Sequence, residues 1–147
     1  MADSRFEGLV EPLFRLLSSE HDFARALAAK TLGRIGATGL PAILRASRSD
    51  QPVARRGGAQ ALAIYCQRLE FVDSETAGRQ VVDLILPVLL ELLRLDDPGV
   101  VLMALEAVSK LGAQAGGLLD AVSALEASQD RRIAEKAQRA RRAISKQ

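Results

Sequence analysis

The sequence is poor in the residues that build disulfides, metal sites and aromatic cores. Its 147 residues include one cysteine, Cys66, one histidine, His21, one tyrosine and no tryptophan. A single cysteine excludes an internal disulfide, and one cysteine with one histidine leaves a zinc ion without its usual ligands. Aromatic residues make up only 3% of the chain, while hydrophobic residues, mostly aliphatic, make up 48%. This composition favours packed helices over a sheet, so we expect an all-α fold without a cofactor.

Long apolar runs are missing as well. The longest, LILPVLLELL, is interrupted by Pro87 and Glu91 and is shorter than the roughly 20 residues that cross a bilayer. The N-terminal stretch MADSRFEGLVEP lacks the basic segment and apolar core of a secretory signal. We therefore expect a cytoplasmic chain without membrane contact. Its length suits a single domain over residues 1–147, either compact or a short repeat array.

One phrase recurs along the chain. HDFARALAAKTLGRIG, residues 21–36, is followed by PVARRGGAQALAIY from Pro52, by PGVVLMALEAVSKLG from Pro98 and, in weaker form, by RRIAEKAQRARRAIS from Arg131. Each copy has apolar residues at helical spacing, and a shorter apolar segment precedes it. The pattern predicts four helix pairs, none of which could bury its apolar face without a neighbour.

The connectors before these helices carry helix-starting residues. Asp97 stands directly before Pro98, which is the order of an N-cap followed by proline in the first helical turn. Asp22, Asp50 and Asp130 occupy matching places in the other copies. We expect these aspartates to begin the second helix of each pair.

Two features inside the second copy predict close packing. Gly57 and Gly58 fall in the middle of an expected helix, where each glycine costs on the order of 1 kcal/mol relative to alanine. Either a neighbouring helix or a ligand must approach them closely, and we favour the helix. Cys66 follows on the inward side and is interpreted as a small core residue.

The copies resemble the second helix of HEAT and HEAT-like repeats, including those of the phycobilin (PBS) lyase type. The family pattern reads Asp-x-x-Val-Arg-x-x-Ala-Ala-x-Ala-Leu-Gly-x-Ile-Gly, and the first copy matches it at Arg25, Ala28, Ala29, Leu32, Gly33, Ile35 and Gly36, with Asp22 directly after the place of the family's aspartate. The third copy departs from it with Val101 in place of the arginine. The resemblance implies an α-solenoid, wound as a right-handed superhelix. Its units would cover about residues 5–36, 37–71, 74–112 and 116–147, with an insertion near 68–80.

The resemblance also places the second helices on the concave side of the solenoid, where a partner would bind. Apolar residues recur at outward positions of these helices, with charged residues around them, which is the pattern of a protein interface. The alternative is that neighbouring units bury these residues. The candidate binding residues are Leu27, Lys30, Arg34, Arg56, Ile64, Leu102, Met103 and Glu106.

Charge is segregated although the net charge is only +2. Lysine and arginine exceed aspartate and glutamate by seven in residues 25–68 and by six in residues 131–147, whereas acids prevail by eight in residues 69–130. On a helical projection the last segment has an apolar face opposite a basic one. The basic face comprises Arg131, Arg132, Lys136, Arg139, Arg142 and Lys146. It could serve as a solubilising end cap or bind phosphates.

The sequence offers little for catalysis. His21 falls in a connector and Cys66 in the core, so no nucleophile and base are expected together. We predict a non-catalytic module that binds a protein partner or a second copy of itself. Two alternatives stay open, namely nucleic-acid binding through residues 25–68 and 131–147, and a lyase-like or accessory enzyme subunit.

Overall fold

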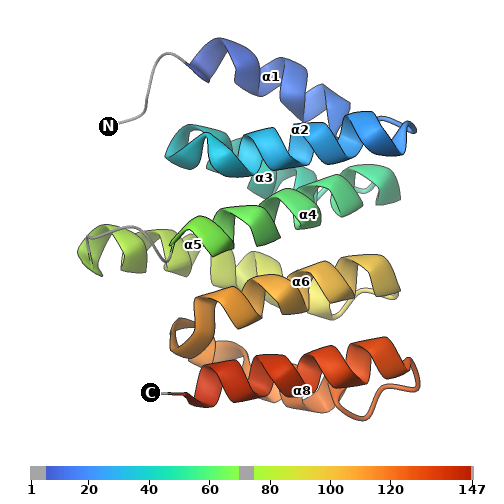
Figure 1. The fold of residues 1–147 in the computed structure, drawn as a ribbon, viewed down its shortest axis with the longest axis vertical. Coiled ribbons are helices and arrows are strands. Elements are labelled where there is room, and N and C mark those ends of the chain that lie inside the picture. The colour runs from blue at the N-terminus through green and yellow to red at the C-terminus, as the bar shows by residue number, and fades with distance from the viewer. Residues whose placement is uncertain (1–5, 70–74, 147) are drawn as a thin grey trace. The chain divides into compact units, whose positions relative to one another are not determined.

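The computed structural model describes residues 6–69 and 75–146, and these residues form helices with no strand among them (Figure 1). The all-α prediction is confirmed. The first two pairs are α1 (Glu7–Leu16) with α2 (Asp22–Arg34) and α3 (Leu40–Ser47) with α4 (Pro52–Arg68). The last two are α5 (Glu75–Leu93) with α6 (Pro98–Leu111) and α7 (Leu119–Leu125) with α8 (Arg131–Ser145). Short 3₁₀ helices, η2 (Gly36–Gly39) and η4 (Gly112–Leu118), precede α3 and α7.

The chain divides into two compact units, Met1–Tyr65 and Cys66–Gln147, with the boundary inside α4. The expected insertion near residues 68–80 includes residues 70–74, which lie outside the described residues. On either side of them, α4 ends at Arg68 and α5 begins at Glu75. Within the described residues no helix is both long and apolar enough to cross a membrane.

In the first unit, glycines let α4 approach its neighbours closely. A Cβ atom on Gly57 would lie 2.7 Å from the carbonyl oxygen of Leu17, which follows α1. A Cβ on Gly58 would overlap the backbone of Ala46 and Ser47 at the end of α3. Because real side-chain atoms cannot come this near to a backbone, only glycine fits at both places. The hypothesis that Gly57 and Gly58 serve helix packing is confirmed.

In the second unit, α6 packs on α5 and α8, and α7 packs on α8. Helix α8 buries Ile133, Ala137, Ala140 and Ile144, the four residues of its predicted apolar face. Small alanines in the middle of this face allow α8 to lie close to α6, so little space is left between the two helices.

Two of the predicted N-caps form and a third shifts by one residue. Asp97 accepts a hydrogen bond from the Val100 backbone N–H, and Asp130 accepts one from that of Arg132. Helix α2 instead begins at Asp22, with His21 at the N-cap position. The Asp22 carboxylate pairs with Arg25, and no side-chain cap hydrogen bond forms at the start of α2.

Replacing Asp97 by alanine should lower the free energy of unfolding by about 1 kcal/mol, because the first turn of α6 loses the acceptor for its Val100 N–H. Urea denaturation followed by circular dichroism measures the change. Asp96→Ala is the matched control, since the exposed Asp96 precedes the cap position. Equal stabilities of the two variants would contradict a capping role for Asp97.

Candidate protein-binding surfaces

Helix α2 has one open stripe. Beyond its first residue, Asp22, its exposed residues are Phe23, Leu27, Lys30 and Arg34, and every other position is buried or half-buried. Their spacing places all four within an arc of about 60° at 100° per residue. Phe23 is 81% exposed and Leu27 is 53% exposed. The stripe therefore has an apolar half toward the start of α2 and a cationic half toward its end.

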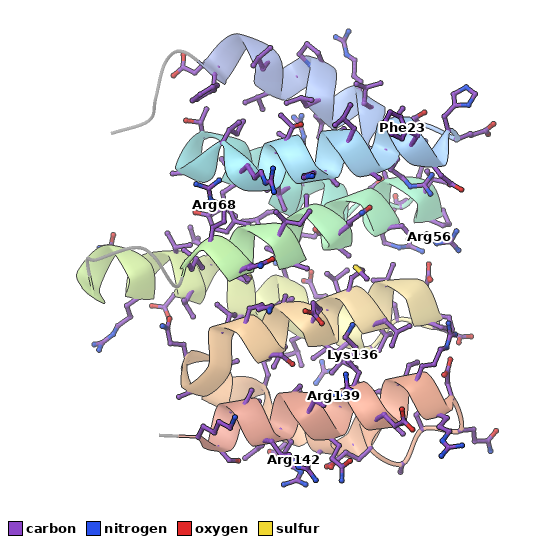
Figure 2. The ribbon with its side chains drawn as sticks, in the orientation of Figure 1. Phe23, Arg56, Arg68, Lys136, Arg139 and Arg142 are labelled. Atoms are coloured by element: carbon purple, nitrogen blue, oxygen red, sulfur yellow. The ribbon has the colours of Figure 1, made fainter. Side chains whose placement is uncertain are left out.

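Helix α4 lies beside α2 and runs in the same direction (Figure 1). Its outward residues within the first unit are Arg56, which is exposed, and Gln60 and Ile64, which are half-buried. Figure 2 shows Arg56 near the start of α4 and Phe23 near the start of α2. We call the set Phe23, Leu27, Lys30, Arg34, Arg56 and Gln60 the α2–α4 face.

The structure changes the interpretation of Ile64, which was expected to stand outward as a contact residue. Its side chain packs against Gly33, where an added Cβ would lie 2.6 Å from Ile64 Cγ2. Because Gly33 has no side chain, Ile64 fills the space above it and joins α4 to α2. Ile64 is thus mainly a packing residue with one edge open.

Several other cationic side chains of the first unit already have hydrogen-bond or ion-pair partners within that unit. The Arg25 guanidinium donates a hydrogen bond to the Ser19 carbonyl oxygen at 2.9 Å. Arg55, at the equivalent place one repeat later, donates to the Ser49 carbonyl at 3.2 Å. Each arginine thereby ties the connector to the helix that follows it. Arg45 pairs with Glu11 and lies 3.8 Å from the centre of the Phe14 ring.

Lys30 and Arg34 differ from these arginines. Neither has an ion-pair or hydrogen-bond partner for its side chain among the described residues, and both are exposed. Unpaired cations beside exposed apolar side chains leave the α2–α4 face open to a ligand of opposite charge.

In the second unit, the predicted contact residues of α6 are less open. Leu102 and Met103 are half-buried. The Glu106 carboxylate forms an ion pair with the Lys136 ammonium of α8 at 3.0 Å and lies 3.9 Å from the Lys110 ammonium. Glu106 thus joins α6 to α8, and its charge is already balanced.

The predicted basic face of α8 is partly neutralised. Arg131 pairs with Glu135 at 3.1 Å, and Arg132 pairs with Asp130 at 3.0 Å. The hydrogen bond from Arg132 also lowers the pKa of the Asp130 carboxyl below its ordinary value. Lys136 points toward α6, whereas Arg142 lies on the opposite side of α8 (Figure 2). The cations of this face without a partner among the described residues are Arg139, Arg142 and Lys146.

His21 and Cys66, the two side chains considered for catalysis, differ in their exposure to solvent. His21 is exposed in the connector before α2. Cys66 is fully buried, as predicted for a core residue, and burial raises the pKa of its thiol to about 12. A thiol with that pKa stays protonated at neutral pH and is a poor nucleophile. Among residues 6–69 and 75–146, no group of three or more histidine, cysteine or acidic side chains could hold a metal ion.

No protein-family model matches the chain, and none of the curated proteins matches its sequence. Solved structures do match. Two engineered proteins align with TM-scores of 0.67 and 0.69 at 23% and 24% identity, over 93% and 94% of this chain. A computationally designed armadillo repeat protein for modular peptide recognition aligns with a TM-score of 0.68 at 18% identity over 93% of this chain.

These similarities show the fold, which is that of an all-α helical repeat solenoid. The chain spans 62%, 64% and 65% of the length of these three structures, so it corresponds to less than two thirds of each. At these identities the structures carry no information on which residues of this chain bind a partner.

Sequence reasoning missed Phe23. This residue stands four positions before Leu27 and seven before Lys30, so the helical spacing that selected Leu27, Lys30 and Arg34 also includes it. The signal was an aromatic residue in register with three outward positions.

Proposed function

We propose that the chain is a non-catalytic, cytoplasmic protein-binding module of the HEAT-like class, whose second helices carry the binding surfaces. The observation that carries this proposal is the open stripe of α2, where Phe23 and Leu27 are exposed beside unpaired cations. An apolar centre with a charged border is typical of protein interfaces, and large aromatic residues are enriched there.

The fold supports the same proposal. The designed armadillo repeat protein with this fold was made for modular peptide recognition, so adjacent helices of a repeat array can present a surface to a peptide. Such arrays expose equivalent positions of successive units, which suits an extended or helical partner segment.

Each unit would contribute its own residues. In the first unit these are Leu27, Lys30, Arg34 and Arg56, with Ile64 supporting the surface from α4. In the second unit Leu102 and Met103 would make apolar contacts at the side of α6. Glu106 would act there by holding α6 to α8 through Lys136 rather than by meeting the partner.

The proposal predicts that Leu27→Ser reduces recovery of a specific protein partner at least about 10-fold, because interface anchors commonly contribute more than 1 kcal/mol. The tagged full chain is used to recover partners from native lysate, with and without nuclease. Stability should change by no more than about 0.5 kcal/mol, since Leu27 is exposed.

The matched control is Leu84→Ser on α5, because Leu84 is 58% exposed and similar in exposure to Leu27. This variant should retain the partner. Recovery that disappears with nuclease, or that Leu84→Ser and Leu27→Ser reduce equally, would contradict protein binding through α2.

A second candidate function is nucleic-acid binding through α8, favoured by the three unpaired cations Arg139, Arg142 and Lys146. The support is weaker, because three other residues of the basic face are balanced by carboxylates. Phosphate contacts would make the affinity fall steeply with salt, which fluorescence anisotropy with labelled DNA and RNA from about 50 to 200 mM salt would detect.

A further inference from the structure

We propose that the α2–α4 face binds an acidic protein segment that carries large apolar side chains. This inference rests on the proposed function and specifies the chemistry of the partner. The first unit is rich in positive charge, because residues 25–65 contain seven lysines and arginines but a single acidic residue, Asp50.

The local fold concentrates the available part of this charge on one face. Arg25, Arg45 and Arg55 are occupied by a carboxylate or by connector carbonyl groups. Lys30 and Arg34, by contrast, extend from α2 into solvent without a partner among the described residues. Cations that the fold does not use and does not bury attract carboxylates from outside.

The order of residues along α2 defines how a segment would lie. Phe23 and Leu27 form the first half of the stripe, and Lys30 and Arg34 form the second. From Phe23 to Arg34 the helix rises about 16 Å, which matches about five residues of an extended chain. A segment with leucine-type side chains at one end and carboxylates at the other is therefore complementary to the face.

The same features favour a protein segment over nucleic acid. Half of the stripe is apolar, and an aliphatic side chain such as Leu27 gains nothing from phosphates. Nucleic-acid sites instead need several phosphate contacts and stacking platforms. Here Phe23 is the only aromatic residue of the α2–α4 face, and it stands at the end of α2 opposite Lys30 and Arg34.

The test uses the full chain and fluorescein-labelled peptides in fluorescence anisotropy. The first probe is a short peptide of leucine, glutamate and aspartate. A second probe replaces its leucines by serine, and a third replaces its acids by lysine. We expect the first probe to bind at least about 10-fold more tightly than either of the others, with an affinity that falls as salt rises.

Variants locate the site. Phe23→Ser and Leu27→Ser should each raise the Kd of the first probe at least about 10-fold, and the double variant Lys30→Glu/Arg34→Glu should do so and remove most of the salt dependence. The controls are Leu84→Ser and Arg139→Glu/Arg142→Glu, which change exposed residues elsewhere and should leave Kd within about twofold. Circular dichroism confirms that each variant is folded.

Five outcomes would overturn the inference. The first probe could fail to bind, the lysine probe could bind as tightly, or the α8 charge variant could weaken binding as much as the α2 variant. Single-stranded DNA that displaces the first probe at equal concentration would assign the face to nucleic acid. Self-association that Leu27→Ser abolishes, without probe binding, would assign it to a second copy.

Failure here is separable from failure of the proposed function. If no acidic probe binds but Leu27→Ser still loses the protein recovered from lysate, the face binds protein and only the charge of the partner is wrong. If neither experiment responds to Leu27→Ser, both the proposed function and this inference fail.

Discussion

Gly58→Ala is expected to lower the free energy of unfolding by about 1 to 2 kcal/mol. The added methyl group would overlap the Ser47 backbone nitrogen and the Ala46 carbonyl carbon at the end of α3. Backbone cannot turn aside as a long side chain can, so α4 would have to move away from α3. Overpacking of this kind costs about 1 to 3 kcal/mol and outweighs the helix propensity gained with alanine, which is less than about 1 kcal/mol.

The matched control for this variant is Gly8→Ala in α1, where an added Cβ meets no atom within 4 Å. That change should leave the stability unchanged or raise it by up to about 1 kcal/mol, because alanine is the better helix former. Urea unfolding monitored by circular dichroism measures both variants. A Gly58→Ala variant as stable as the parent would show that α4 does not approach α3 as closely as described.

Cys66 is expected to react with a thiol reagent at least about 1,000-fold more slowly in the native protein than in the unfolded chain. The side chain is fully buried, and the thiolate that would attack the reagent is disfavoured there, with a pKa of about 12. Reaction then requires opening of the structure, which costs several kcal/mol in a stable domain.

Alkylation by iodoacetamide at pH 8, with and without urea and followed by mass spectrometry, measures this ratio. The control is Ser18→Cys in a Cys66→Ala background, because Ser18 is exposed and its replacement should react at the unfolded rate. Native and unfolded rates of Cys66 within a factor of about 10 would contradict a rigid core around it.

The same thiol makes stability depend on pH in the alkaline range. Its pKa in the folded protein, about 12, lies above the ordinary value of about 8.5, so the unfolded chain loses its proton first. The contribution of the protonated thiol to the free energy of unfolding is therefore complete below about pH 8 and falls as pH rises toward 12. Replacing Cys66 by alanine should remove this part of the pH dependence of the free energy of unfolding.

The helices themselves could be read from the sequence, because helical periodicity is a local property. Apolar residues at spacings of three and four predicted α8 and its buried residues Ile133, Ala137, Ala140 and Ile144. The glycine pair in α4 was recognised as a packing site because mid-helix glycines need a compensating close contact. Proline next to Asp97 marked the start of α6 for a similarly local reason.

Whether each outward-facing residue is exposed, packed or paired with a charge depends on tertiary structure. Ile64 and Leu27 were both expected to face outward, yet Ile64 packs on Gly33 of α2, whereas Leu27 meets no such partner and stays 53% exposed. Lys136 looked like part of a basic face, but α6 brings Glu106 to within 3.0 Å of it. Periodicity defines the direction of a side chain about its own helix axis. Residues about 30 positions away in the chain decide whether the side chain then meets solvent, a glycine of a neighbouring helix or an opposite charge. No local sequence pattern contains those residues.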